Sequence, residues 1–308
     1  MPELPDVVVY LERLEALIGG QVLERVRIAS VFVVRSYDPP ISALEGKRVV
    51  GFRRIGKRLV VELEGDLFLV IHLMIAGRLV LRDPGAPIPK RLGLAAFDFA
   101  KTTVLFTEAG TTKRASLHVV RGQAALAPFS RGGVEPLEAS LEEFAVALAR
   151  ESHTVKRSLT DPRLFSGIGN AYSDEILLRA RLSPVKLTSR LTAEEIARLY
   201  DATRSTLLEW VDRLRREAGE GFPEKVTAFR PEMAVHGKYG APCPVCGTKV
   251  QRIRYASNEV NYCPRCQTEG KVLADRGLSR LLHGDWPKSI DELEELEAQR
   301  APKETRSK

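Results

Sequence analysis

The four cysteines of the chain form two Cys-x-x-Cys pairs. Cys243 and Cys246 make the first pair, Cys263 and Cys266 make the second, and sixteen residues separate the pairs. Each pair lets two thiolates converge from one tight turn, and this spacing is typical of a tetrahedral zinc site. Two disulfides are the alternative, and they require an oxidising compartment. Because four thiolates fill the coordination sphere, the expected Zn²⁺ ion is structural and activates no water.

A glycine-rich turn with the sequence Gly-Ile-Gly-Asn covers residues 167–170, ahead of helical periodicity at 171–182. Gly167, Gly169 and Asn170 would present bare backbone N–H groups and the positive end of a helix dipole, an arrangement that suits a phosphate. Lys156, about one helix earlier, could add charge to the same phosphate. A plain turn between helices and a surface lysine are the alternative interpretations.

The composition is that of a globular protein. Of the 308 residues 44% are hydrophobic and 28% are charged, and the mean hydropathy is −0.14. These values exclude collagen-like and disordered chains. The longest apolar stretch, residues 67–77, is too short for a membrane span. The N-terminus has neither a basic segment nor an apolar one, so we expect no secretory signal and a cytoplasmic location.

The charge balance is basic, and the excess is concentrated near the cysteines. Lys and Arg number 47 against 40 Asp and Glu, which gives a net charge of +7. Residues 230–282 alone carry nine basic and four acidic side chains, a net charge of +5. Such a segment suits a polyanionic partner such as nucleic acid, and a solvated basic face is the alternative.

The elements that must position these residues fall into a β-rich part and a helical part. Residues 6–18 have helical spacing and end at two glycines. Residues 128–136 are typical of a linker. Two capping boxes, Ser140 with Glu143 and Thr192 with Glu195, predict helices after the linker. Strands are expected over the β-branched runs at 22–34, 47–55, 58–63, 67–72, 78–81 and 104–106.

Four separated motifs, in order, resemble the formamidopyrimidine-DNA glycosylase/endonuclease VIII family. They are the N-terminal Met-Pro-Glu-Leu-Pro-Asp, the Gly56-Lys57 turn after a strand, the turn at 167–175, and the cysteine ribbon. The resemblance covers about residues 2–267. It implies an α+β fold with an N-terminal helix, a β-sandwich domain, a helical domain with a helix-two-turn-helix motif, and a zinc-ribbon β-hairpin. The expected domains are 1–130, 131–228, 229–270 and a C-terminal tail at 271–308.

The resemblance also implies a bifunctional DNA glycosylase and abasic-site lyase that excises oxidised bases in base excision repair. After removal of Met1, the secondary amine of Pro2 would attack C1′ of the damaged nucleotide and form a Schiff base that drives β- and then δ-elimination. Glu3 would move protons at the sugar. Lys57 would hold the flanking phosphate or act as an acid near the leaving group. An ordinary N-terminal proline is the alternative interpretation of Pro2.

The implied partner is double-stranded DNA that contains damaged bases or abasic sites, bound by a monomer, with no membrane. The target nucleotide must leave the duplex at a cost of a few kcal/mol, and phosphate contacts offset that cost. The resemblance places Asn170 and the turn at 167–169 on one side of the backbone and the zinc hairpin on the other. Such contacts position DNA without reading its sequence, so affinity should fall steeply with salt.

Three departures from the family pattern limit what the resemblance implies. Asn258 stands five residues before the third cysteine, where the family usually has a phosphate-clamping arginine. Asparagine has neither charge nor a bidentate fork, and Arg252 or Arg254 could substitute. Residues 72–77 lack the usual wedge, and residues 108–118 lack the arginine-phenylalanine pair of the guanine-specific branch. We therefore expect a lesion preference other than 8-oxoguanine opposite cytosine, and a weaker lyase.

Two hypotheses from other classes compete with this one. The chain could be a non-catalytic binder of damaged or structured DNA that has kept the glycosylase fold. It could also be a zinc-ribbon protein that serves RNA or a protein complex. Pro2, Glu3 and Lys57 together favour the enzyme, because a binder has no chemical need for them. In the tail, residues 291–297 are acidic and helical, and residues 301–308 are expected to be disordered.

Overall fold

A computed structural model describes residues 1–110, 112–224, 226–227, 229–255, 258–274 and 287–300. The chain divides into two compact units. The first unit contains residues 1–143, 161–169 and 207–228, and the second contains residues 144–160, 170–206 and 229–308. The expected disorder at residues 301–308 lies outside the described residues. No helix in the described part of the chain combines the length and the apolar composition that a membrane crossing requires.

The first unit begins with helix α1 (Leu4–Ile18), which starts two residues earlier than the apolar spacing indicates. The start is fixed by a capping box in which the Glu3 side chain accepts a backbone N–H of the first turn. In return, Asp6 accepts the backbone N–H of Glu3 at 2.9 Å. Pro5 stands in the first turn, where its missing N–H costs no hydrogen bond. Gly19 ends the helix, as the sequence predicts.

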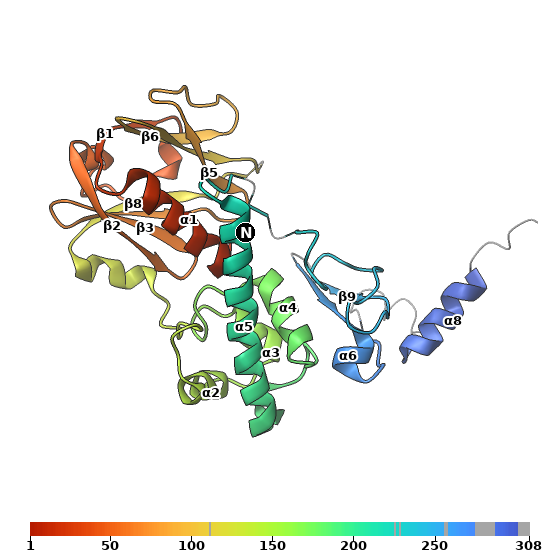
Figure 1. The fold of residues 1–308 in the computed structure, drawn as a ribbon. Helices are drawn as coiled ribbons and strands as arrows, with labels where there is room; N and C mark the ends of the chain where they lie inside the picture. The colour runs from red at the N-terminus through yellow and green to blue at the C-terminus, as the bar shows by residue number, and fades with distance from the viewer. Residues whose placement is uncertain (111, 225, 228, 256–257, 275–286, 301–308) are drawn as a thin grey trace, which may run out of the picture. The chain divides into compact units, whose positions relative to one another are not determined.

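After α1 the first unit is built mainly of β-strands (Figure 1). They form an eight-stranded antiparallel sheet with the order β5-β7-β6-β1-β2-β3-β4-β8. Strands β1 and β2 share only a short stretch of pairing, so two four-stranded halves are joined at a narrow waist. The bounds are β1 Val22–Ile28, β2 Lys47–Ile55, β3 Arg58–Leu63, β4 Leu67–His72, β5 Gly77–Arg82, β6 Gly93–Phe99, β7 Thr103–Glu108 and β8 Ser116–Arg121. Short 3₁₀ helices cover η1 Val31–Val33, η2 Ile41–Leu44 and η3 Gln123–Phe129.

One apolar core lies between the two halves of the sheet and is covered by one face of α1. Both halves contribute fully buried side chains, among them Leu79, Phe106, Leu59 and Leu117. This arrangement is the N-terminal sheet domain that the resemblance implies. The expected strand at 22–34 ends at Ile28, and the sequence analysis missed β6 and β8. Strand β6 is alanine-rich at its centre, and β8 carries His118, so neither has a strong β-branched pattern.

The second unit is helical and carries a small hairpin. The helices after the sheet are α2 Leu141–Ala149, α3 Val155–Thr160, α4 Asn170–Arg179, η4 Thr188–Arg190 and α5 Ala193–Ala218, whose residues from 207 onward belong to the first unit. Both predicted capping boxes form. Ser140 and Glu143 exchange bonds of 2.8 and 3.2 Å, and Thr192 and Glu195 exchange bonds of 3.0 and 3.2 Å. Strands β9 (Gln251–Arg254) and β10 (Glu259–Tyr262) form the predicted hairpin.

Two further helices follow the hairpin. Helix α6 (Pro264–Thr268) carries the last cysteine of the second pair. Helix α8 (Ile290–Arg300) contains the predicted acidic segment. Ile290 is 1% exposed, and its N–H donates to the Gly270 carbonyl at 2.8 Å, so the start of α8 is fixed to the end of the zinc module.

Candidate functional site

The N-terminal residues of the first unit are held by the turn at 167–169. Pro2 is buried and Glu3 is 3% exposed. The backbone N–H of Gly169 donates to Glu3 Oε2 at 2.7 Å. The N–H of Leu4, unpaired within its own helix, donates to the Gly167 carbonyl at 2.9 Å. The turn that sequence analysis assigned to phosphate binding therefore also orients the Glu3 carboxylate.

Lys57 reaches the same place from the turn between β2 and β3. Gly56 adopts a φ of +61°, a left-handed conformation that allows this tight turn. A methyl group on Gly169 would collide with both the Glu3 carboxyl and Lys57 Nζ, so the two side chains converge on that glycine. Burial lowers the pKa of Lys57, and the nearby carboxylates of Glu3 and Asp6 partly oppose this effect. The structure thus brings together Glu3, Lys57 and Gly169.

Arg54, which the sequence analysis missed, stabilises the corner formed by Glu3, Lys57 and Gly169. Its Nη1 donates to the Gly56 carbonyl at 2.8 Å and to Ser166 Oγ at 3.2 Å. Its Nη2 pairs with Glu135. One guanidinium therefore ties the turn before Lys57 to the turn before Gly167.

His72, which the sequence analysis named only as part of a variant motif, lies directly across the sheet from Arg58. Burial lowers its pKa to about 4, and the neighbouring charges of Arg58, Lys57 and His118 act in the same direction. His72 is therefore neutral at pH 7. Arg58 and His118 make no ion pair among the described residues, so no carboxylate paired with either side chain offsets its charge near His72.

The amine at the start of the chain lies in the same electrostatic environment. Burial lowers the pKa of the Met1 amino group, and the charges of Arg78 and Lys57 also lower it, while Glu3 and Asp6 raise it. A lowered pKa enlarges the neutral, nucleophilic fraction of an amine near pH 7. This corner can therefore hold a neutral amine beside a carboxylate and a cation.

In the second unit, Lys156 is buried rather than facing solvent. Its side chain is 8% exposed, and its Nζ donates to the Asn170 carbonyl at 2.9 Å, Ser173 Oγ at 2.9 Å and Asp174 Oδ1 at 2.5 Å. An ammonium group has three N–H donors. All three have partners inside the protein, so this geometry makes Lys156 a support for Asn170, which differs from the direct phosphate contact that the sequence suggested.

Asp174 and Glu175, both missed by the sequence analysis, connect α4 to the segment that leads into the zinc module. The Glu175 carboxylate accepts the backbone N–H groups of residues 234–236 at 2.8 to 3.0 Å. Asp174 Oδ2 lies 2.8 Å from His236 Nδ1 and accepts Asn261 Nδ2 at 3.4 Å. The only hint in the sequence was the run of three polar residues, Ser-Asp-Glu, near the middle of the expected helix.

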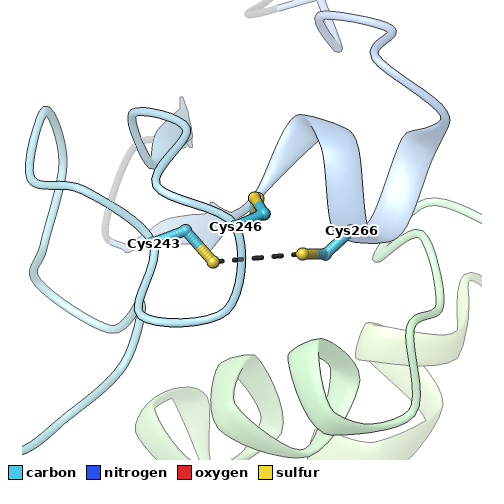
Figure 2. A group of neighbouring side chains, drawn as sticks. Cys243, Cys246 and Cys266 are labelled. Carbon is cyan, nitrogen blue, oxygen red and sulfur yellow. Dashed lines mark hydrogen bonds between the residues drawn. The ribbon is translucent and has the colours of Figure 1, made fainter.

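The four cysteines converge as predicted, and Figure 2 shows three of them, Cys243, Cys246 and Cys266. All four sulfur atoms lie within 4.8 Å of one another. Zn–S bonds of about 2.3 Å in a tetrahedron place the sulfurs about 3.8 Å apart. The separations of 4.0 Å between Cys243 and Cys266 and 3.4 Å between Cys246 and Cys263 fit this geometry. The module therefore binds one structural Zn²⁺ through four thiolates.

The remaining candidate residues lie on the hairpin. Asn258 is exposed, and its carbonyl accepts the N–H of Tyr255 at 2.8 Å. Arg252 lies over the Tyr239 ring, with 4.2 Å between its guanidinium carbon and the ring centre, and pairs with Glu259 at 3.6 Å. Arg254 is exposed. Their contact with DNA remains a prediction.

Three features together characterise the fold and the site. They are a buried N-terminus beside Glu3 and Lys57, the buried glycine turn at 167–169, and the four-cysteine zinc hairpin. Three family models match the chain: the formamidopyrimidine-DNA glycosylase N-terminal domain over residues 1–114, its H2TH domain over residues 133–217, and a zinc finger found in FPG and IleRS over residues 240–268.

Whole proteins match over the same range. The formamidopyrimidine-DNA glycosylase of Heliobacterium modesticaldum is 33% identical, over 87% of this chain and 100% of that protein. The crystal structure of the Thermus thermophilus protein is 34% identical with a TM-score of 0.73, over 86% of this chain and 98% of that one. The Lactococcus lactis protein in complex with abasic-site DNA is 26% identical with a TM-score of 0.75, over 86% and 99%. The chain belongs to the formamidopyrimidine-DNA glycosylase family.

Proposed function

We propose that the chain is a DNA glycosylase of base excision repair that also acts as an abasic-site lyase, with Pro2 as its nucleophile. The observation that carries the proposal is the convergence of the Glu3 carboxylate and the Lys57 ammonium on Gly169, beside a buried Pro2. The Lactococcus relative bound to abasic-site DNA supports the choice of substrate.

The proposed reaction begins when removal of Met1 frees the secondary amine of Pro2. The lone pair of that amine attacks C1′, the glycosidic bond breaks, and the base leaves with the bonding electrons and a proton. A secondary amine that has bonded C1′ becomes an iminium ion when the sugar ring opens. The iminium acidifies the C2′ proton, so the 3′ phosphate leaves by β-elimination, and a second elimination releases the 5′ phosphate.

Each side chain of the corner has a proposed part in this sequence. Glu3 transfers protons at the ring oxygen and at C2′, and its bond to the Gly169 N–H holds it in place. Lys57 donates to the phosphate that flanks the lesion, or protonates the leaving group. Its lowered pKa favours proton donation near neutral pH. In the second unit, Asn170 and the zinc hairpin hold the DNA backbone.

One observation favours a second candidate function. Asn258 occupies the hairpin position where the family usually has an arginine, so the strongest expected phosphate contact is missing. A non-catalytic protein that holds damaged DNA through its other backbone contacts is compatible with that substitution. It would bind abasic-site duplex and form no covalent adduct.

Borohydride reduction of the iminium intermediate separates the two functions. Full-length protein freed of Met1 is incubated with duplexes that carry an abasic site, 8-oxoguanine or an oxidised pyrimidine. We expect a trapped adduct on the abasic duplex, and the best-trapped base lesion to be other than 8-oxoguanine opposite cytosine. Tight binding to the abasic duplex without any adduct would favour the binding protein and contradict the lyase.

A further inference from the structure

A contact between α4 and β10 holds the side chain of Asn170. Its Nδ2 donates to the backbone carbonyl of Glu259 at 2.9 Å. The backbone carbonyl of Asn170 accepts Lys156 Nζ at 2.9 Å. A side-chain amide has two N–H donors, so the Glu259 bond occupies one of them and fixes the direction of the other. The zinc hairpin, rather than α4 alone, therefore sets the orientation of this amide.

Asp174 joins the two groups that hold Asn170. The side chain of Asp174 is 0% exposed, and its Oδ1 accepts Lys156 Nζ, which holds the Asn170 backbone. Its Oδ2 accepts Asn261 Nδ2, two residues along β10 from the carbonyl that holds the Asn170 side chain. A buried charge is tolerated only when it is paired and hydrogen-bonded. Oδ2 also lies 2.8 Å from His236 Nδ1, so the partners of Asp174 come from α3, from the segment that leads into the zinc module and from β10.

Two of the three candidate residues on the hairpin are poorly suited to phosphate binding. Asn258 carries no charge, and the Arg252 guanidinium is engaged by Tyr239 and Glu259. Besides the exposed Arg254, the docking of β10 on α4 therefore offers the zinc hairpin an indirect route to a phosphate, through Asn170.

We propose that Asp174 is a positioning residue for DNA binding: it docks the zinc hairpin on α4, and this docking aims the Asn170 amide at a backbone phosphate. The inference rests on the proposed function only in taking the phosphate to be that of DNA.

A double-mutant cycle tests the inference on the full-length, zinc-loaded chain. The variants are Asp174→Asn, Asn170→Ala and the double variant, and the probe is a duplex with a tetrahydrofuran abasic analogue. We expect Asp174→Asn to weaken binding about tenfold in the native background, because Asn at position 174 cannot accept on both of its polar atoms. In the Asn170→Ala background the same change should cost less than about twofold.

Two outcomes would overturn the inference. An equal loss in both backgrounds would mean that Asp174 acts on DNA affinity independently of Asn170, and unchanged binding would mean that the docking does not matter. Each variant must contain about one zinc ion per chain, so that a change in binding cannot come from loss of the metal. If Asp174→Asn does not fold, Asn261→Ser takes its place in the cycle, since it removes only one bond to the carboxylate.

Gln123→Ala is the matched control, because it truncates an exposed amide on η3 in the first unit. It should leave binding within about twofold of the native value. Borohydride trapping at saturating protein is run on the same variants. If the native chain forms no trapped adduct, the proposed lyase activity is contradicted. The double-mutant cycle on binding would still decide the role of Asp174.

Discussion

Lys57 and Lys156 are both shielded from solvent, Lys57 in part and Lys156 almost fully. They differ in the hydrogen bonds of their ammonium groups. Lys57, in the first unit, makes no hydrogen bond or ion pair among the described residues, although it lies in the field of Glu3 and Asp6. Lys156, in the second unit, has all three N–H donors bonded within the protein. A partly buried cation whose donors have no protein partner is available to a ligand, whereas a cation whose donors are all bonded maintains structure. The difference supports the two proposals, a chemical role for Lys57 and a positioning role for Lys156.

The largest expected effect on stability comes from breaking the buried ion pair between Lys156 and Asp174. Lys156→Met leaves Asp174 buried without its cation, and we expect a loss of about 3–5 kcal/mol in the free energy of unfolding. Urea denaturation measures the change. Lys186→Met is the control, because the Lys186–Glu195 pair is more exposed and should contribute less than about 1 kcal/mol. Equal losses for the two variants would remove the distinction between buried network and surface pair.

Replacement of Lys57 is expected to slow the reaction and to leave stability nearly unchanged. Lys57→Met should slow strand cleavage on the abasic duplex about a hundredfold, the usual range for loss of a proton-transfer group. Because Lys57 has no ion pair to lose, the free energy of unfolding should stay within about 1 kcal/mol. Single-turnover cleavage and urea denaturation of one preparation give both values. A large loss of stability with normal cleavage would assign Lys57 to structure instead.

A smaller effect is expected from crowding the corner. In Gly169→Ala the new methyl group displaces the Glu3 carboxyl and Lys57 Nζ. Displacements of about 1 Å cost up to about a hundredfold in rate, so we expect cleavage to fall between about tenfold and a hundredfold. Gly110→Ala is the control, since its nearest contact would be at an ordinary 3.4 Å. Normal cleavage by Gly169→Ala would show that Glu3 and Lys57 need not meet there.

The smallest expected effect concerns pH. The folded-state pKa of His72, about 4, lies below the ordinary value of 6.5, so the folded chain favours the neutral ring. The contribution of His72 to stability is therefore complete above about pH 6.5 and is lost as the pH falls towards 4. Solvent screening keeps this loss below about 1–2 kcal/mol. The stability difference between native protein and His72→Gln, measured by urea denaturation, should shrink over that window and stay constant above it.

Local signals in the sequence predicted local structure well. The cysteine pairs indicated zinc, and Ser140 and Thr192 indicated helix starts, because each signal depends on residues within one or two turns. The capping box of Glu3 and Asp6 has the same three-residue spacing and could have been found, but an acidic N-cap is an unusual form of that motif.

Environments that depend on distant segments could not be read in the same way. Lys156 resembles any exposed helical lysine in the sequence, and its burial depends on Asp174 and on the strand at 259–262 that completes the network. Arg54 depends on Glu135 and Ser166, far along the chain. The roles expected of Pro2 and Lys57 came from the family resemblance, since neither residue is distinctive by type and spacing alone.

The most direct test of the account is to locate the covalent bond to DNA. Protein freed of Met1 is trapped with borohydride on an abasic-site duplex, digested, and sequenced by mass spectrometry. We expect a reduced sugar adduct on the Pro2 nitrogen, and no adduct when Met1 is retained and blocks that amine. An adduct on Lys57, or one that forms equally well with Met1 in place, would contradict Pro2 as the nucleophile.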